Sequence, residues 1–304
     1  MGLNFEMKKI SEKEAAELIS CSKELKELEK ILKEMGKIAV AFSGGVDSTF
    51  LLCFAQTVLE HENVLALTAL APNFAPDEIS FAKDYTDFLG IKHLTIPVEM
   101  NKHVEGSDCS SKSSYTMESL FTENPPDRCY HCKRMVFSSL LGSPELSGFT
   151  LCDGTNTDDS TDYRPGMKAL KELKIRSPLA EAGLSKVQIR AASKALNVPI
   201  WNKPAFACLA SRIPYGEPIT AEKLSSIYIL ESALRDAGFA QCRIRHHGDV
   251  ARIEVLPEDR QRFISDDNLC NLIQETAIKA GFKFAALDIL GYRMGSLNET
   301  LAIK

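Results

Sequence analysis

The sequence predicts an α/β fold in which helices cover both faces of a parallel sheet and a smaller α/β domain follows at the C-terminal end. From residue 37 to residue 200, short β-type apolar runs alternate with helical patterns, as they do in βαβ units. From about residue 214 the order changes to helix, hairpin, two helices and a strand. A chain of 304 residues is long enough for two cores, so we place domains at residues 1–205 and 206–304.

The individual elements follow from apolar periodicity and from the capping, glycine and proline residues that interrupt it. Ser11 and Glu14 fit a capping box, which predicts one helix from residue 11 to about residue 35. Residues 99–128 are polar and serine-rich with weak periodicity, which predicts a long loop. Further strands are expected at 37–42, 64–70, 92–97, up to 151, 241–246, 251–256 and 284–290, and further helices at 48–59, 76–89, 184–196, 221–237 and twice before the last strand.

Composition and charge argue against several functional classes. A formal net charge of -5 is opposite in sign to the basic surface that nucleic-acid binding requires. The chain begins with no apolar run of signal-peptide type and contains none of membrane-spanning length. Nine irregularly spaced cysteines then indicate thiols or metal ligands rather than disulfides. We therefore expect a cytoplasmic protein without a membrane partner and without a broad nucleic-acid surface, which leaves only a local basic groove open.

A turn of sequence Ser-Gly-Gly-Val-Asp-Ser, from Ser43 to Ser48, lies between a predicted buried strand and a predicted helix. Its backbone N–H groups and the helix N-terminus suit an anion, and Gly44 and Gly45 let the backbone approach it closely. Asp47 fits beside a phosphate when Mg²⁺ bridges the two. Walker loops carry a lysine that this turn lacks. The pattern is similar to the PP-loop of the ATP pyrophosphatases, which cleave ATP to AMP and pyrophosphate.

A second polar turn, Asp153-Gly154-Thr155-Asn156, follows a predicted strand. On the residues alone it is either an Asx turn that ends the strand or part of a ligand site. In the families with a similar loop, Gly154, Thr155 and Asn156 would lie close to the nucleotide.

Three cysteines stand apart from the others by their context. Cys129 and Cys132 form a CxxC motif, which can bind zinc, act as a redox pair, hold part of an iron–sulfur cluster or be two ordinary thiols. Cys208 lies in a proline-bracketed loop next to an arginine. Three thiolates would leave a [4Fe–4S] cluster with one iron open to a small sulfur species, unless His131 supplies a fourth ligand.

Several charged residues near the C-terminal end are candidates for binding a phosphate. Arg243 and Arg245 alternate along a predicted strand, so their side chains share one face, and Glu254 falls on the partner strand. Two guanidinium groups on one face suit bidentate contact with a phosphate. Arg212 is a further candidate, and Glu231 is expected to face the same site. An exposed basic face is the other interpretation.

Together these motifs resemble the LarE family of ATP-dependent sulfur transferases, and they span nearly the whole chain. The matching segments are 43–48, 127–133, 153–156, 163–166, 176–179, 203–216 and 291–296. The resemblance implies a PP-loop ATP pyrophosphatase fold and a small-molecule substrate, pyridinium-3,5-biscarboxylic acid mononucleotide. A substrate carboxylate is adenylylated and then converted to a thiocarboxylate during synthesis of the nickel-pincer nucleotide cofactor. The family resemblance also suggests a homo-oligomer.

The resemblance assigns roles to the residues named above. The loop and Asp47 bind ATP and Mg²⁺, and Cys208 takes part in the sulfur transfer. In single-cysteine members the matching cysteine is sacrificed and becomes dehydroalanine. Cys129 and Cys132 are features of the three-cysteine branch, in which all three thiolates hold a [4Fe–4S] cluster that passes on a sulfide. The sulfur donor to that cluster is unidentified.

Other readings stay open at this point. A tRNA thiolase also combines a PP-loop with three cysteines, but it would have a basic surface. A ligase of the GMP or NAD synthetase type has the loop without a use for the cysteines. A nucleotide sensor would bind ATP without releasing pyrophosphate.

Overall fold

The first of two structural units is built on a four-stranded parallel sheet of order β3 (Lys92–Pro97), β2 (Val64–Leu70), β1 (Ile38–Ala41) and β4 (Thr150–Cys152). This computed structural model describes residues 12–99, 101, 116–160, 165–204, 208–293 and 295–296. The unit takes in residues up to 71, 76–117 and 127–205, and the second unit takes in residues 72–75, 118–126 and 206–304. The predicted parallel sheet and smaller C-terminal sheet domain are thus confirmed.

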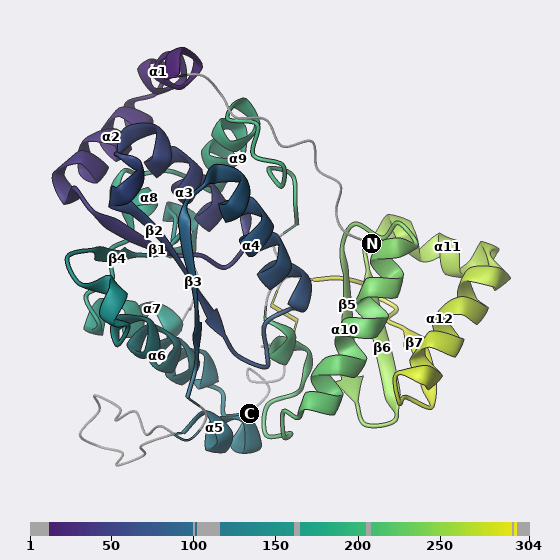
Figure 1. Cartoon of the computed structure of the whole chain (residues 1–304). Coiled ribbons are helices and arrows are strands. Elements are labelled where there is room, and N and C mark those ends of the chain that lie inside the picture. Colours follow the sequence, from purple (N-terminus) through teal and green to yellow (C-terminus); the bar gives the residue numbers. More distant parts are fainter. Residues whose placement is uncertain are drawn as a thin grey trace. The chain divides into compact units, whose positions relative to one another are not determined.

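Helices cover both faces of the parallel sheet, as Figure 1 shows for α2, α3 and α9 on one side and α6 and α7 on the other. Alternate side chains of the central strands, such as Ile38 and Val40, enter one core with the first group of helices. The helices are α1 (Glu12–Ser20), α2 (Lys23–Met35), α3 (Val46–Val58), α4 (Pro76–Leu89), α6 (Arg128–Leu141), α7 (Pro165–Glu172), α8 (Pro178–Glu181) and α9 (Lys186–Ala195).

The single helix predicted from residue 11 to residue 35 is wrong, because the structure has two helices there. The helix is interrupted at Cys21 and Ser22. Ser22 is the N-cap of α2 and has an extended backbone conformation. Its hydroxyl oxygen accepts a hydrogen bond from Leu25 N at 3.3 Å. A serine that satisfies an N-terminal N–H favours starting a new helix over continuing the old one. Ser11 lies outside the described residues.

Replacing Ser22 with alanine should lower the free energy of unfolding by about 1 kcal/mol, because it removes the cap of α2. Urea denaturation followed by circular dichroism measures this change. Ser20→Ala is the control, since the exposed Ser20 hydroxyl contacts the Glu17 carbonyl oxygen and Cys21 Sγ and is not the cap of α2. An equal loss in both variants would contradict the capping role.

The long loop predicted for residues 99–128 also needs correction. Its end contains helix α5 (Met117–Glu123), and α6 begins at Arg128, so the CxxC motif is helical. Weak periodicity hid α5 because the helix has only seven residues. Residues 102–115 lie outside the described part of the chain.

The second unit holds a three-stranded sheet of order β5 (Cys242–His247), β6 (Val250–Val255) and β7 (Phe284–Leu287). The first two strands form the predicted antiparallel hairpin, and β7 pairs with β6 in parallel. Helices α10 (Ala221–Asp236) and α12 (Asp267–Lys279) pack on the sheet, and α11 (Arg260–Ser265) precedes α12. In the described residues, no helix is long and apolar enough to cross a membrane.

Candidate functional site

The loop after β1 has the conformation of an anion-binding turn. Gly44 has a φ of +71°, and a Cβ there would lie 2.7 Å from the Glu78 carbonyl oxygen, so only glycine fits. Gly45 is the N-cap of α3, whose first N–H groups point back toward the loop. The Ser48 hydroxyl accepts from Ser43 N at 3.3 Å and lies 3.2 Å from the Ser43 hydroxyl. These contacts between Ser43 and Ser48 therefore join the two ends of the loop at the start of α3.

Asp47 lies in the first turn of α3, and its carboxylate is only partly satisfied. One oxygen, Oδ2, is 3.5 Å from Lys186 Nζ. The other, Oδ1, is buried and has no hydrogen-bond partner among the described residues. Burial raises the pKa of the Asp47 carboxyl, and the nearby Lys186 opposes that rise. A buried carboxylate oxygen beside a helix N-terminus suits a divalent cation such as Mg²⁺.

The second turn predicted from the sequence packs directly on this loop. β4 pairs with β1, so the carboxyl ends of both strands lie at one edge of the sheet. A Cβ on Gly154 would lie 2.8 Å from Ser48 N. Thr155 donates through its backbone N–H and its hydroxyl to the Asp153 carboxylate. Asn156 is fully buried, and in the described structure its Nδ2 has no hydrogen-bond partner. The structure thus brings the two turns together.

The second unit gathers buried arginines and glutamates around β5. Arg212, at the end of the 3₁₀ turn Leu209–Arg212, makes a bidentate pair with Glu231 of α10, with N–O distances of 2.8 and 2.9 Å. Both residues are 1 % exposed. Glu231 also accepts from Ile244 N at 3.1 Å, which satisfies an N–H of edge strand β5. These contacts join the Cys208 loop, α10 and β5.

The other two arginines occupy one face of β5, as the alternation predicts. Arg245 contacts Glu254 on β6, with Nη2–Oε2 at 2.8 Å, and also donates to Ser211 O and to the Ser296 hydroxyl. Arg243 lies over the Tyr292 ring, 5.3 Å from its centroid. Burial first, and then the positive charge of Arg212, lowers the pKa of Arg243. An anion bound there would offset both effects.

Cys208 is exposed and has a polar neighbour from a distant part of the sequence. Asn73, which is 2 % exposed and belongs to the same unit, donates from Nδ2 to Cys208 Sγ at 2.9 Å. Arg212 Nη1 donates to the Cys208 carbonyl oxygen at 3.0 Å. The Cys208 thiol in turn donates to the Asn73 carbonyl oxygen at 3.7 Å, so Asn73 contacts the sulfur through both its side chain and its backbone.

Cys129 and Cys132 lie one helical turn apart on α6 in the first unit, whereas Cys208 belongs to the second. Cys129 is exposed and Cys132 is partly exposed. A spacing of three residues puts both thiols on one side of the helix, as two ligands of one metal centre require. His131 instead contacts Asp127, with Nε2–Oδ2 at 3.1 Å. The described residues contain no group of three or more Cys, His, Asp or Glu side chains arranged as a metal site.

Sequence reasoning missed three residues that contact predicted site residues. Lys186 lies beside Asp47, Asn73 beside Cys208, and Lys203 beside the loop, with Nζ 3.4 Å from the Gly44 carbonyl oxygen. Two of them carried a signal. Lys203 begins the matching segment 203–216, and Lys186 is a lysine in the first turn of a helix, where the macrodipole disfavours a cation. Tertiary folding alone brings Asn73 to Cys208, 135 residues away.

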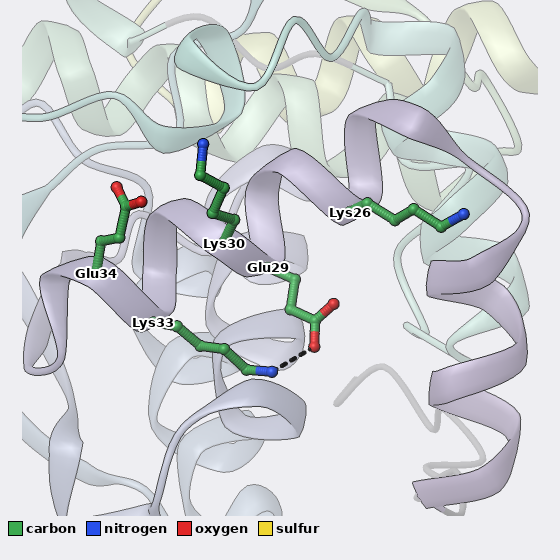
Figure 2. Close-up of a pocket in the computed structure, with 5 residues that line it drawn as sticks. All are labelled: Lys26, Glu29, Lys30, Lys33 and Glu34. Carbon is green, nitrogen blue, oxygen red and sulfur yellow. Dashed lines mark hydrogen bonds and ion pairs between the residues drawn. The ribbon is translucent and has the colours of Figure 1, made fainter.

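A shallow hollow on α2 is lined by none of the predicted site residues. Figure 2 shows its lining side chains, Lys26, Glu29, Lys30, Lys33 and Glu34, which extend from one helix. Lys33 Nζ and Glu29 Oε1 form an exposed ion pair at 2.7 Å. Alternating charges with this spacing are typical of a solvated helix face.

Comparisons with known proteins show which families and proteins the chain resembles. A family model described as NAD synthase matches residues 21–142, which include the loop. The pyridinium-3,5-bisthiocarboxylic acid mononucleotide synthase of Lactiplantibacillus plantarum is 34% identical over 273 residues, which are 89% of this chain and 92% of that protein. An uncharacterized Synechocystis protein is 39% identical over 91% of this chain and 97% of its own length. An uncharacterized Methanocaldococcus jannaschii protein is 30% identical over 89% of this chain and 98% of its own length.

Proposed function

This chain belongs to the LarE family of PP-loop proteins, and on that basis we propose that it is an ATP-dependent sulfur transferase. Its substrate is pyridinium-3,5-biscarboxylic acid mononucleotide, and its product carries a thiocarboxylate. The reaction has two steps. A substrate carboxylate oxygen attacks the α-phosphorus of ATP and pyrophosphate leaves. A sulfur nucleophile then attacks the carbonyl carbon of the acyl-adenylate and AMP leaves. The adenylylation is needed because a free carboxylate is a poor electrophile.

The ATP site is supported most directly by the pair of turns that meet at the ends of β1 and β4. The loop N–H groups receive the pyrophosphate part of ATP, and Asp47 Oδ1 is available for Mg²⁺. Asn156 Nδ2 is a buried donor without a partner in the described structure, as expected of a group that meets a ligand. In this proposal Ser43, Gly44, Gly45, Ser48, Gly154 and Thr155 shape the same site.

The substrate phosphate binds at the arginine cluster of the second unit. Arg243 and Arg245 share one face of β5, and Arg212 lies close enough to lower the pKa of Arg243. Glu231 and Glu254 hold Arg212 and Arg245 in fixed orientations. Three guanidinium groups against two carboxylates leave a net positive charge, which a phosphate balances.

In the version that we favour, Cys129, Cys132 and Cys208 hold a [4Fe–4S] cluster. When bound, such a cluster supplies the sulfide that becomes the thiocarboxylate sulfur. Cys129 and Cys132 provide two thiols on one side of α6, and Cys208 provides an exposed third. Asn73 orients the Cys208 sulfur through its N–H donor, and such hydrogen bonds tune metal-bound thiolates.

Sacrificial transfer from Cys208 is the second candidate, and the 2.9 Å contact from Asn73 Nδ2 to Sγ would orient the sulfur for this route as well. Here the thiolate attacks the acyl-adenylate and AMP leaves, which gives a thioester. Loss of the Cys208 α-proton then breaks the Cβ–S bond, so the sulfur departs with the product and dehydroalanine stays on the chain.

Anaerobic iron–sulfide reconstitution distinguishes the two versions. We expect about four irons per chain in the wild type, and loss of the cluster absorbance in Cys129→Ala, Cys132→Ala and Cys208→Ala. Multiple turnovers of thiocarboxylate should follow. If the wild type takes up no iron yet thiolates one substrate per chain, and its mass falls by about that of H₂S, Cys208 is consumed and the cluster version is wrong.

The reaction class has its own test, which does not depend on the sulfur source. Pyrophosphate release should require the mononucleotide together with ATP and Mg²⁺. Release with tRNA instead would support the thiolase, and ATP binding without any release would support a sensor. The homo-oligomer stays a prediction of the family resemblance, and the cytoplasmic location stays a prediction from the sequence pattern and the cysteines. A sulfur donor is the further partner that the cluster version predicts.

A further inference from the structure

Lys186 occupies a position where a cation is normally unfavourable. It is the first residue of α9, and no acidic residue accompanies it in that turn. The N-terminus of a helix carries a partial positive charge, so a lysine there lowers helix stability unless another interaction compensates. The start of α9 is fixed by a capping box between Ser185 and Gln188, with Ser185 N to Gln188 Oε1 at 2.9 Å. The lysine is therefore held in place rather than left at a frayed end.

The turn that packs on the phosphate loop also positions Lys186. The turn after Asn156 reaches α9 through two contacts: Thr157 N donates to the Leu184 carbonyl oxygen at 3.1 Å, and Lys186 N donates to Asp158 Oδ2 at 2.9 Å. Gly154 of the same turn lies against Ser48 N. Direct contacts therefore connect the loop, the turn and the first residue of α9 within the first unit.

The Lys186 side chain contacts the loop although Lys186 itself belongs to another segment of the chain. Lys186 Nζ lies 3.5 Å from Asp47 Oδ2, and the side chain is 33 % exposed, so the ammonium group borders solvent and the anion-binding turn. Lys203, the other lysine near the loop, donates to the Gly44 carbonyl oxygen and lies 3.4 Å from Glu78 Oε1. Lys203 thus binds the loop backbone and Glu78, whereas among the described residues the Lys186 ammonium group contacts the Asp47 carboxylate, which would hold Mg²⁺.

We propose that Lys186 binds the β- and γ-phosphate oxygens of ATP and so replaces the lysine that this loop lacks. The inference rests on the proposed ATP site. In the absence of nucleotide, Lys186 neutralises Asp47. With Mg²⁺ and ATP bound, Asp47 would hold the metal, and the Lys186 ammonium group would be free to donate to the phosphates. The ammonium then stabilises pyrophosphate as the leaving group.

Replacing Lys186 with methionine, which keeps most of the apolar stem, tests this role by equilibrium binding on the full chain. ATP and pyrophosphate should each bind about 10- to 100-fold more weakly in the presence of Mg²⁺, as expected for one lost charge-assisted hydrogen bond. AMP, which lacks the β- and γ-phosphates, should bind within about twofold of the wild type. Lys186→Arg should restore part of the ATP affinity.

Lys194→Met is the matched control. Lys194 is on the same helix but lies over the Trp201 ring, 4.8 Å from its centroid. Its replacement should leave the affinities for ATP, pyrophosphate and AMP unchanged. If wild-type protein bound no ATP at all, the proposed ATP site itself would be wrong. If ATP binds but Lys186→Met loses AMP affinity as much as ATP affinity, the assignment to the β- and γ-phosphates is overturned.

A double variant separates direct contact from simple neutralisation of Asp47. In an Asp47→Asn background there is no carboxylate for Lys186 to neutralise. Adding Lys186→Met should still weaken binding of pyrophosphate, measured without Mg²⁺, by about fivefold or more. No further loss in the double variant would show that Lys186 acts only through Asp47, and the proposal would fail.

Discussion

Cys208→Ala is expected to abolish thiocarboxylate formation while mononucleotide-dependent pyrophosphate release continues. Both candidate sulfur routes need this thiol, as a cluster ligand or as the nucleophile. The residues that we assign to ATP belong to the first unit and Cys208 belongs to the second, so in this proposal adenylylation does not use the sulfur. Product mass spectrometry and a pyrophosphate assay on the same samples measure the two steps separately.

Cys270→Ala is the control for Cys208→Ala. Cys270 is in the same unit but donates from Sγ to the Phe263 carbonyl oxygen, away from the predicted site residues. Its replacement should leave both steps at wild-type levels. Thiocarboxylate formation that persists in Cys208→Ala at more than a few per cent would remove Cys208 from the reaction.

Gly154→Ala is expected to lower the rate of pyrophosphate release by about 100-fold. The φ of Gly154 is not in the left-handed region, so alanine is allowed by the backbone. The added Cβ would instead lie 2.8 Å from Ser48 N and 3.1 Å from the Asp47 carbonyl carbon. Because both are backbone atoms, the turn or the loop must move, and a shift of less than 1 Å displaces the N–H groups that meet the phosphates.

Gly142→Ala controls for replacing a glycine elsewhere in the same unit. A Cβ there would meet only the Ser138 and Ser139 carbonyl oxygens, at 3.4 and 3.5 Å, which is ordinary contact. It should release pyrophosphate at the wild-type rate. Thermal unfolding of both variants shows whether the fold survives. A folded Gly154→Ala protein with normal pyrophosphate release would contradict the proposed contact between turn and loop.

Much of the fold was predictable because buried strands and amphipathic helices leave local patterns. The predicted strands at 64–70 and 92–97 and the helix at 76–89 match the structure to the residue. The errors came from features that periodicity does not contain. Ser22 starts a new helix inside a continuous helical pattern, and α5 is too short to show a period. The Ser22 cap explains the first error, and the short length of α5 explains the second.

The residues of the candidate site likewise fall into those that local motifs predict and those that only tertiary contacts reveal. Gly44, Asp47 and Gly154 could be singled out from short motifs, because each motif sits between a strand and a helix or at the end of a strand. The contacts of Lys186 with Asp47 and of Asn73 with Cys208 could not, since they join distant segments. The arginines on β5 were predicted to share a face, whereas the pairing of Arg212 with Glu231 depends on the packing of α10.

The sequence by itself determined the parallel α/β sheet, the loop without a lysine and the three cysteines set apart by their context. These depend on residues within a few positions of one another, whose order directly limits local geometry. The tertiary structure decided which turn meets the loop, which lysine reaches Asp47 and which amide reaches Cys208. Those choices depend on how strands pair and helices pack over long separations. Such packing is set by the sum of many weak contacts, so no short stretch of sequence contains it.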